Sequence, residues 1–265
     1  MKPLDFFASH PVFTHDEFSA QVSEAASPQT RKNVLAYHVR RGRLVRVRRG
    51  LYASVPRGVE ASSFDPDPYL IATRLAPDAT VAYHAALQFR GRTYSVWHRF
   101  HFVTATWAKG LSFRGSEFIP VQLPASLRRL PDQGTGVADE RHADGTVRTT
   151  TFERSLVDLL DAPDLGGGWE EVWRSLEMVE FFDLDAVTAY ALALGSALTV
   201  ARVGFYLEQH RTELMVEDRH LERLRAHAPK QAAYFDPPRK PGKLVKGWNL
   251  VVPDYVLRRS WGEVL

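Results

Sequence analysis

The N-terminal part of the chain carries a run of basic side chains that no acidic side chain interrupts. Nine Lys and Arg residues lie between Arg31 and Arg57, and no Asp or Glu stands among them. Residues 1–59 have a net charge of +6, from ten basic and four acidic side chains, whereas the rest of the chain has a net charge of −3. A local positive field attracts a polyanion, because basic side chains neutralise phosphates and release their counterions. A single arginine usually does no more than keep a surface solvated. Nine basic side chains with no acidic side chain among them predict a DNA-binding segment.

Two short helices are expected before this run. Leu4–Ser9 has the composition of a first helix. Thr14 and Glu17 have the spacing of a capping box, in which the Thr hydroxyl accepts from the Glu amide and the Glu carboxylate reaches back. We therefore expect a second helix to begin there and to run to about Ala25.

A third helix carries the first basic residues. Ser27 is a favourable N-cap and Pro28 suits the first helical position, so the helix is expected to run from Pro28 to Arg41 and to end at Gly42. Its apolar stripe is narrow, and it consists of Leu35, His38 and Val39. We expect His38 to be a packed core residue rather than a functional one.

The sequence changes to period two after this helix. Leu44–Arg48 alternates, Arg49-Gly50 suits a turn, and Leu51–Val55 can return as a second strand. Side chains two apart on a strand point the same way, so Arg46 and Arg48 are expected to share one face. Three helices followed by a basic hairpin are the order of a winged helix-turn-helix.

In such a fold the second helix of the helix-turn-helix lies in the major groove of DNA. The N-terminal residues of that helix lie nearest the bases. Gln and Asn side chains pair with adenine, and Arg pairs with guanine. The candidate base-reading residues are therefore Gln29, Thr30, Arg31, Lys32 and Asn33. Further candidates for contact with sugar, phosphate or the minor groove are Tyr37, Arg40, Arg41, Arg43, Arg46, Arg48 and Arg49.

The chain is expected to divide into a DNA-binding domain and a larger second domain. Residues 1–58 form the winged helix-turn-helix, residues 59–68 are a linker rich in Pro, Gly, Ser and Asp, and residues 69–265 form the second domain. The second domain has mixed patterns, which predict an α+β protein. Expected helices span 69–75, 83–89, 169–180, 185–194 and 198–210, one more follows a capping box at 150–153, and expected strands span 100–104, 117–121 and 248–252.

The second domain holds no recognisable catalytic or metal-binding set, so we expect no enzyme and no cofactor. Gly166-Gly167-Gly168 lacks the residues of a phosphate-binding loop and fits a helix-terminating turn. The pair Asp183 and Asp185 fits helix capping, and Asp158 and Asp161 fit a polar helix face. His98 and His101 lack the carboxylate partner of a zinc site.

Bulk properties narrow the class further. The chain has no cysteine, which excludes disulfides and thiolate zinc sites. No segment approaches the ~20 apolar residues that cross a bilayer, and the first residues do not form a signal peptide. We therefore expect a cytoplasmic protein without a membrane partner. A basic, Pro-rich segment that contains Arg239, Lys240, Lys243 and Lys246 leaves two interpretations open, namely contact with a nucleic acid or protein partner and a solvated loop.

Residues 40–52, Arg-Arg-Gly-Arg-Leu-Val-Arg-Val-Arg-Arg-Gly-Leu-Tyr, resemble the end of the winged helix in the AbiEi antitoxin family, of the type G-x-L-x-R-V-x-R-G-x-Y. Weaker similarities follow in the same order along the chain, at residues 82–87, 151–160, 166–168, 203–208 and 248–253. The chain departs from the family pattern at Thr151-Phe152, where a Pro is usual, and at Ala85, where a Ser is common.

The resemblance implies a two-domain bacterial antitoxin of a type IV toxin–antitoxin system, with a role in phage defence. Its winged helix would repress the chain's own operon at an operator with inverted repeats. Its second domain would counteract a nucleotidyltransferase toxin, with or without a direct complex. Two alternatives stay open, namely a winged-helix regulator whose second domain senses a small molecule and a DNA-associated nuclease or nucleotidyltransferase.

Overall fold

The computed structural model describes residues 1–22, 27–128, 134–236 and 240–261. Its internal contacts divide the chain into two compact units. Unit 1 comprises Met1–Val81, His98–Gln122 and Ala138–Thr149, and unit 2 comprises Ala82–Trp97, Leu123–Val137 and Thr150–Leu265. Helices and strands occur in both units, so the predicted mixed α+β class is confirmed.

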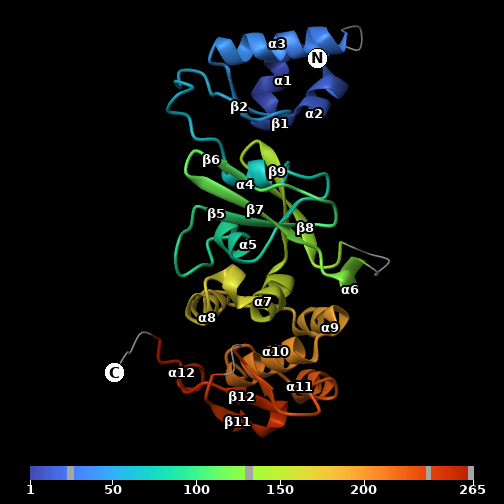
Figure 1. The fold of residues 1–265 in the computed structure, drawn as a ribbon, viewed down its shortest axis with the longest axis vertical. Helices are drawn as coiled ribbons and strands as arrows, with labels where there is room; N and C mark the ends of the chain where they lie inside the picture. The colour runs from blue at the N-terminus through green and yellow to red at the C-terminus, as the bar shows by residue number, and fades with distance from the viewer. Residues whose placement is uncertain (23–26, 129–133, 237–239, 262–265) are drawn as a thin grey trace. The chain divides into compact units, whose positions relative to one another are not determined.

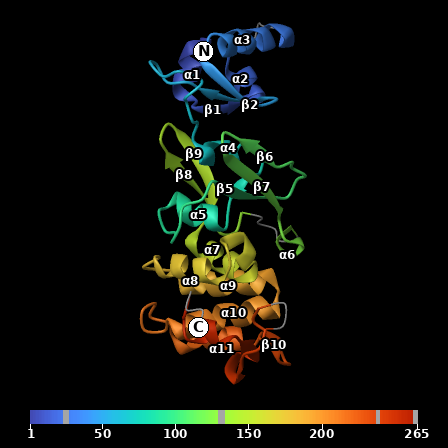
Figure 2. The same cartoon turned by 60° about the vertical axis from the view of Figure 1, so that its left-hand side comes forward.

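The N-terminal module of unit 1 has the element order of a winged helix-turn-helix. Figures 1 and 2 draw it in blue, with α1 between α3 and the strands. The strands form an antiparallel sheet in the order β1-β3-β2. The elements are α1 (Pro3–Ser9), β1 (Val12–Thr14), α2 (His15–Gln21), α3 (Pro28–Arg40), β2 (Leu44–Arg48) and β3 (Leu51–Ser54). The predicted helices and hairpin are confirmed. Strand β1 is not among the predicted elements, because its three residues are too few to show an alternating pattern.

Local hydrogen bonds explain where α2 and α3 begin. The Thr14 hydroxyl accepts from the Glu17 amide at 3.1 Å and the Glu17 carboxylate accepts from the Thr14 amide at 2.5 Å, which confirms the capping box. The Ser27 hydroxyl accepts from the Thr30 amide at 3.1 Å and caps α3. The predicted end of the second helix at Ala25 lies outside the described residues. After α3, Gly42 has φ +66°, a left-handed conformation that favours glycine.

An aromatic cluster holds these short elements together. Phe6 lies 5.0 Å from Phe13 and 5.4 Å from Phe18 between ring centroids, and both pairs meet edge to face. These rings come from α1, β1 and α2, and Leu35 of α3 is fully buried in the same core. Aromatic pairs in this geometry contribute about 0.5–1.5 kcal/mol beyond the burial of their area. The cluster therefore fixes the position of α3 relative to the sheet.

The wing strand β2 is not regular. Arg46 pairs with Tyr52, but Arg48 pairs with Leu51, so one extra residue lies between the two arginines. Tyr52 and Leu51 point to opposite faces of β3, and so do the arginines that pair with them. The expectation that Arg46 and Arg48 share a face is therefore wrong, because the register shift reverses the alternation.

A mixed sheet forms the rest of unit 1. Its strand order is β6-β7-β5-β4-β9-β8, with β5 parallel to β7 and β4 parallel to β9. The predicted strands at 100–104 and 117–121 are confirmed, whereas β4 and β6 are too short to show a period. The elements are α4 (Pro68–Ala72), β4 (Thr80–Val81), β5 (Arg99–Thr104), β6 (Leu111–Phe113), β7 (Ser116–Gln122), β8 (Val137–His142) and β9 (Gly145–Thr150).

Unit 2 consists mainly of helices. A small sheet, in the order β10-β12-β11, accompanies them. The elements are α5 (His84–Phe89), α6 (Ala125–Arg128), α7 (Phe152–Asp161), η1 (Pro163–Gly166), α8 (Trp169–Glu177), α9 (Leu184–Leu194), α10 (Ala197–Gln209), α11 (Asp218–Arg225), β10 (Ala233–Tyr234), β11 (Lys243–Val245), η2 (Lys246–Trp248), β12 (Leu250–Val252) and α12 (Asp254–Leu257). The predicted helices near 83–89, 169–180, 185–194 and 198–210 are confirmed with small shifts at their ends.

Two expectations about α7 are wrong. The helix is capped by Thr151, whose hydroxyl accepts from the Arg154 amide, and not by a box that begins at Thr150. Glu153 instead accepts from the Asp183 amide at 3.2 Å. Asp158 does not lie on a polar face but is buried, with 4% of its surface exposed.

We expect Phe13→Ala to lower the free energy of unfolding of the N-terminal module by about 3–5 kcal/mol, since it removes a fully buried ring from the aromatic cluster. Hydrogen exchange of peptides from residues 1–55 measures this module separately from unit 2. Leu4→Ala is the matched control, because Leu4 is 52% exposed and its truncation is expected to cost about 1 kcal/mol or less. Equal loss of protection in the two variants would contradict the central role of the cluster.

Candidate nucleic-acid interface

Helix α3 presents two rows of side chains to solvent. Residues four apart lie one above the other on a helix, so each row runs along the helix axis. The first row consists of Lys32, Ala36 and Arg40, and the second of Gln29, Asn33, Tyr37 and Arg41, all of them exposed. The opposite side of the helix, with Leu35 and His38, is buried in the core.

A groove of about 930 Å³ lies between the first row and the wing. Lys32 and Arg40 line it from α3, and Arg46 and Arg49 line it from the wing. The remaining lining residues include His15, Asp16, Val39, Gly50 and Tyr52. Four of the predicted DNA-contacting residues are thereby brought together from two elements.

The four basic side chains of this groove are available for a ligand. Lys32, Arg40, Arg46 and Arg49 are exposed, and none of them forms an ion pair with a residue that the structure describes. Asp16 is the acidic residue at the rim, and its fully exposed carboxylate lies 3.3 Å from His15 Nδ1. The groove therefore combines four positive charges with one negative charge, which suits a phosphate backbone.

Two pairwise contacts order the second row. Gln29 Nε2 donates to Asn33 Oδ1 at 3.0 Å, so the two amide groups are linked across one helical turn. The Arg41 guanidinium lies 5.5 Å from the centre of the Tyr37 ring. The second row thus presents amides near the N-terminus of α3 and an aromatic–cation pair near its C-terminus.

The remaining candidates lie elsewhere. Arg31 is half-buried on the Leu35 side of the helix, one turn before that residue. Thr30 takes part in the cap, with its hydroxyl 2.9 Å from the Ser27 hydroxyl. Arg48 turns away from the groove, and its guanidinium donates to the Leu75 carbonyl at 2.7 Å.

Arg43 is exposed at the start of β2, but it lines a different cavity from the groove residues. The structure therefore separates Thr30, Arg31, Arg43 and Arg48 from the two rows and the groove.

No sequence pattern indicates that α2 takes part in the groove. The His15 amide donates to the Gly50 carbonyl at 2.8 Å and so ties the start of α2 to the wing turn. The side chains of His15 and Asp16 thereby reach the groove, although Asp16 and Gly50 are 34 positions apart in the sequence. The capping box locates the start of α2, but no local pattern can reveal this long-range contact.

His38 lies in the core beneath α3, as predicted. Its ring meets the Phe7 ring edge-on at 4.9 Å, and 7% of the residue is exposed. Burial lowers the pKa of His38, and the nearby Arg43 charge lowers it further. The imidazole is therefore neutral in the folded protein at neutral pH.

Buried polar side chains of unit 2 form hydrogen-bonded networks. Arg154 Nε donates to Asp158 at 3.2 Å, and the Tyr190 hydroxyl donates to the same carboxylate at 2.7 Å. Burial raises the pKa of Tyr190 well above its usual range, so the hydroxyl remains a donor. Every polar atom of Asp158 thereby has a fixed partner.

A second network joins α5, α8 and the segment between them. Glu171 accepts from His84 Nε2 at 3.0 Å and from the Ser95 hydroxyl at 2.7 Å, while the Trp97 ring stacks on His84 at 3.8 Å. Serine and histidine both bond to the carboxylate, so the imidazole does not activate the hydroxyl as it does in a nucleophilic triad.

Other expectations about unit 2 are confirmed. Asp183 caps α9 by accepting from the Ala186 amide at 3.0 Å, and Gly167 follows η1 in a left-handed conformation with φ +90°.

In the basic C-terminal segment, Lys240 pairs with Asp236 at 2.7 Å. Arg239 lies outside the described residues.

Neither a metal cluster nor a membrane span is present in the described ranges. Within them, no three His, Asp or Glu side chains converge in a way that would hold a metal ion. No helix among the same residues has both the length and the apolar character needed to cross a bilayer.

Comparison with known proteins shows what the N-terminal module is similar to. Residues 1–55 match the family model described as "Transcriptional regulator, AbiEi antitoxin". The resemblance predicted from the sequence is therefore confirmed over this segment, and the match supports a DNA-binding regulator of the antitoxin type.

A solved structure resembles most of the chain. The crystal structure of the RV2827C protein from Mycobacterium tuberculosis is 18% identical, with a TM-score of 0.60, and the match covers 96% of this chain and 90% of that one. At this identity the likeness concerns the fold alone. None of the curated proteins compared with the chain matches it.

We expect the N-terminal module to lose stability as the pH falls below about 6.5, the usual pKa of histidine. The folded pKa of His38 is lowered, so below that pH the unfolded chain binds a proton that the folded chain does not. The loss amounts to at most about 1.4 kcal/mol per pH unit. Hydrogen exchange of residues 1–55, corrected for intrinsic rates, should show a weaker pH dependence in His38→Gln. An unchanged slope in His38→Gln would refute the assignment.

Proposed function

We propose that the chain is a DNA-binding antitoxin that represses transcription of its own toxin–antitoxin operon. The observation that carries this proposal is the groove between α3 and the wing, where Lys32, Arg40, Arg46 and Arg49 meet and form no ion pair with a described residue. The family match over residues 1–55 independently supports a regulator that binds DNA.

In this proposal the two rows of α3 have different tasks. The groove residues hold the phosphate backbone, because flexible cations recognise phosphate without regard to sequence. The second row reads base edges in the major groove, with Gln29 and Asn33 nearest the bases and Tyr37 and Arg41 at the sugar–phosphate edge. The groove residues therefore contribute affinity for DNA, and the second row contributes specificity for its base sequence. Thr30, Arg31, Arg43 and Arg48 are proposed as secondary contacts at most, since they lie away from these surfaces.

The proposed function assigns a different role to each domain of the chain. Residues 1–58 form the DNA-binding domain, and residues 69–265 form the domain that carries the antitoxic function. Residues 59–68 link these two domains. The operator has inverted repeats, and the functional partner is a nucleotidyltransferase toxin, with or without a direct complex. These features rest on the family resemblance. Growth of cells that express an adjacent nucleotidyltransferase gene, with and without this chain, tests them, and unrelieved toxicity would count against the antitoxin role.

The enzyme alternative has no support in the described residues. A nuclease or nucleotidyltransferase needs clustered acids to hold catalytic metal ions. The buried acids described above, Asp158 and Glu171, are engaged by Arg154, Tyr190, His84 and Ser95 instead.

We expect Lys32→Gln and Arg46→Gln each to weaken binding to DNA from the chain's own promoter region, and to do so equally for all sequences. Removal of one phosphate contact releases one counterion fewer, so the slope of log K against log salt should flatten by about 1 for each charge removed. Fluorescence anisotropy over a range of salt concentrations measures both effects. A reporter under the same promoter should be derepressed by the double variant.

Lys109→Gln is the matched control, because Lys109 is also exposed in unit 1 but lies outside the N-terminal module. It should leave the affinity and the salt slope unchanged. If all three variants bound DNA as the wild type does, the groove would not be the docking surface.

We expect Asn33→Ala to abolish a preference for adenine at one position of each half-site. With Gln29 Nε2 bonded to Asn33 Oδ1, a carbonyl of Gln29 and an amino group of Asn33 remain free. They match the amino donor and the N7 acceptor that adenine presents in the major groove, and loss of such a pair costs about 1–3 kcal/mol of discrimination.

Selection of bound sequences from a random pool measures this preference. Lys32→Gln should bind more weakly but select the same sequence. An Asn33→Ala protein that selects an unchanged sequence would exclude the amide pair from base recognition.

A further inference from the structure

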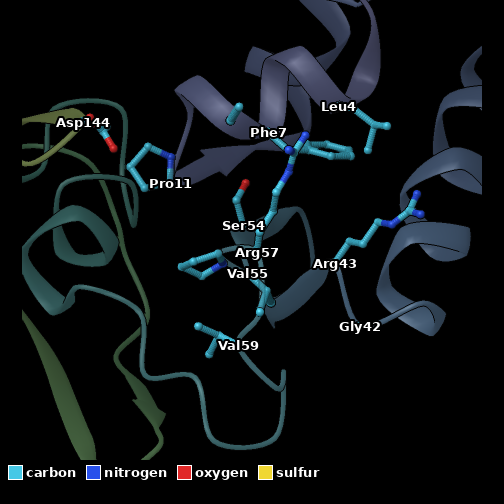
Figure 3. A pocket seen from close by; sticks show the side chains of 13 residues that line it. Leu4, Phe7, Pro11, Gly42, Arg43, Ser54, Val55, Arg57, Val59 and Asp144 are labelled. Atoms are coloured by element: carbon cyan, nitrogen blue, oxygen red, sulfur yellow. The ribbon is translucent and has the colours of Figure 1, made fainter.

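Unit 1 contains a second cavity that the DNA-binding groove does not use. Its volume is about 630 Å³, within the range of small-molecule sites. Figure 3 shows its walls, which are mostly apolar and include Leu4 and Phe7 of α1, Pro11 before β1, and Val55 and Val59 after β3. Two large apolar side chains of this wall remain exposed, Leu4 at 52% and Val59 at 43%. The protein alone therefore leaves apolar surface in the cavity unburied.

Backbone hydrogen bonds hold the walls in place. The Ser54 amide donates to the Pro11 carbonyl at 2.8 Å, and the Val55 amide donates to the Arg43 carbonyl at 2.9 Å. The Ser54 hydroxyl also donates to the His10 carbonyl at 2.8 Å. The cavity is thus preformed, which reduces the conformational cost of binding a ligand.

The charged lining residues are Arg43, Arg57 and Asp144. In Figure 3 the Arg57 side chain points toward the Phe7 side chain, whereas the Arg43 guanidinium points away from it. Arg57 forms no ion pair with a residue that the structure describes. A guanidinium against an apolar wall favours a carboxylate, because its planar fork matches two carboxylate oxygens.

We propose that this cavity binds a small organic anion with an apolar, preferably aromatic, body. The carboxylate pairs with Arg57, and the body packs against Phe7, Pro11 and Val55. Charge complementarity selects an anion over a neutral molecule, and the apolar wall selects an organic anion over inorganic phosphate.

The cavity adjoins the C-terminal end of α3. Gly42 and Arg43, which connect α3 to β2, line it, and the Arg43 amide donates to the His38 carbonyl at 3.0 Å. Phe7 contributes to the cavity wall and also meets the His38 ring. A ligand in this cavity therefore contacts the residues that support the proposed DNA-reading helix.

The test uses the full chain and two matched probes, 2-naphthoate and its neutral amide, 2-naphthamide. We expect naphthoate to raise the melting temperature saturably and naphthamide to do so less, since a ligand that binds only the folded state stabilises it. Calorimetric titration should show that Arg57→Gln weakens naphthoate binding about tenfold or more, the scale of a lost charge-assisted hydrogen bond, without changing naphthamide binding.

Lys109→Gln is the matched control, because it removes one positive charge from an exposed side chain of unit 1 that does not line the cavity. It should bind naphthoate nearly as well as the wild type. Absence of saturable naphthoate binding, or equal binding by wild type and Arg57→Gln, would overturn the proposal. No DNA is present in this experiment, so its failure is distinguishable from a failure of the proposed function.

Discussion

The packing of phenylalanine rings beneath α3 is the interaction on which the N-terminal module depends. Its helices and strands are short, and none of them would be stable alone in water. Phe6, Phe7, Phe13 and Phe18 come from three consecutive elements and bury one another, and Leu35 brings α3 onto the same core. Because this core is apolar and fixed, the exposed side of α3 can carry cations whose mutual repulsion would otherwise oppose folding.

The distribution of charge follows from that arrangement. Basic residues of the wing and of α3 face each other across a groove, while the register shift in β2 directs Arg48 to the Leu75 carbonyl instead. The bond between the His15 amide and the Gly50 carbonyl fixes the wing turn against α2. The proposed DNA-binding surface is therefore composed of distant segments that one small core holds together. Unit 2 shows a different use of charge, because its buried Arg154 and Asp158 are paired with each other.

Local patterns account for the elements that sequence reasoning predicted well. Capping residues, Pro28 and the Arg49-Gly50 turn act within a few residues, so helix starts and the hairpin are visible without tertiary information. Strands of two or three residues, such as β1, β4 and β6, escape such reasoning because they exist only through their partners. The buried position of Asp158 also escaped it, because an i, i+4 pair with Arg154 looks the same on an exposed helix as in a core.

By itself, the sequence determined that a basic module with three helices and a hairpin precedes a larger mixed region. It also determined which residues are charged and where α2 and α3 begin, since these are properties of composition and short-range hydrogen bonding. Only the tertiary structure decided which cations meet. Helical rotation places Arg31 beside the core and Lys32 at the groove, one residue apart. An extra residue in β2 separates Arg46 from Arg48. Such choices depend on packing between distant segments, and no local pattern encodes them.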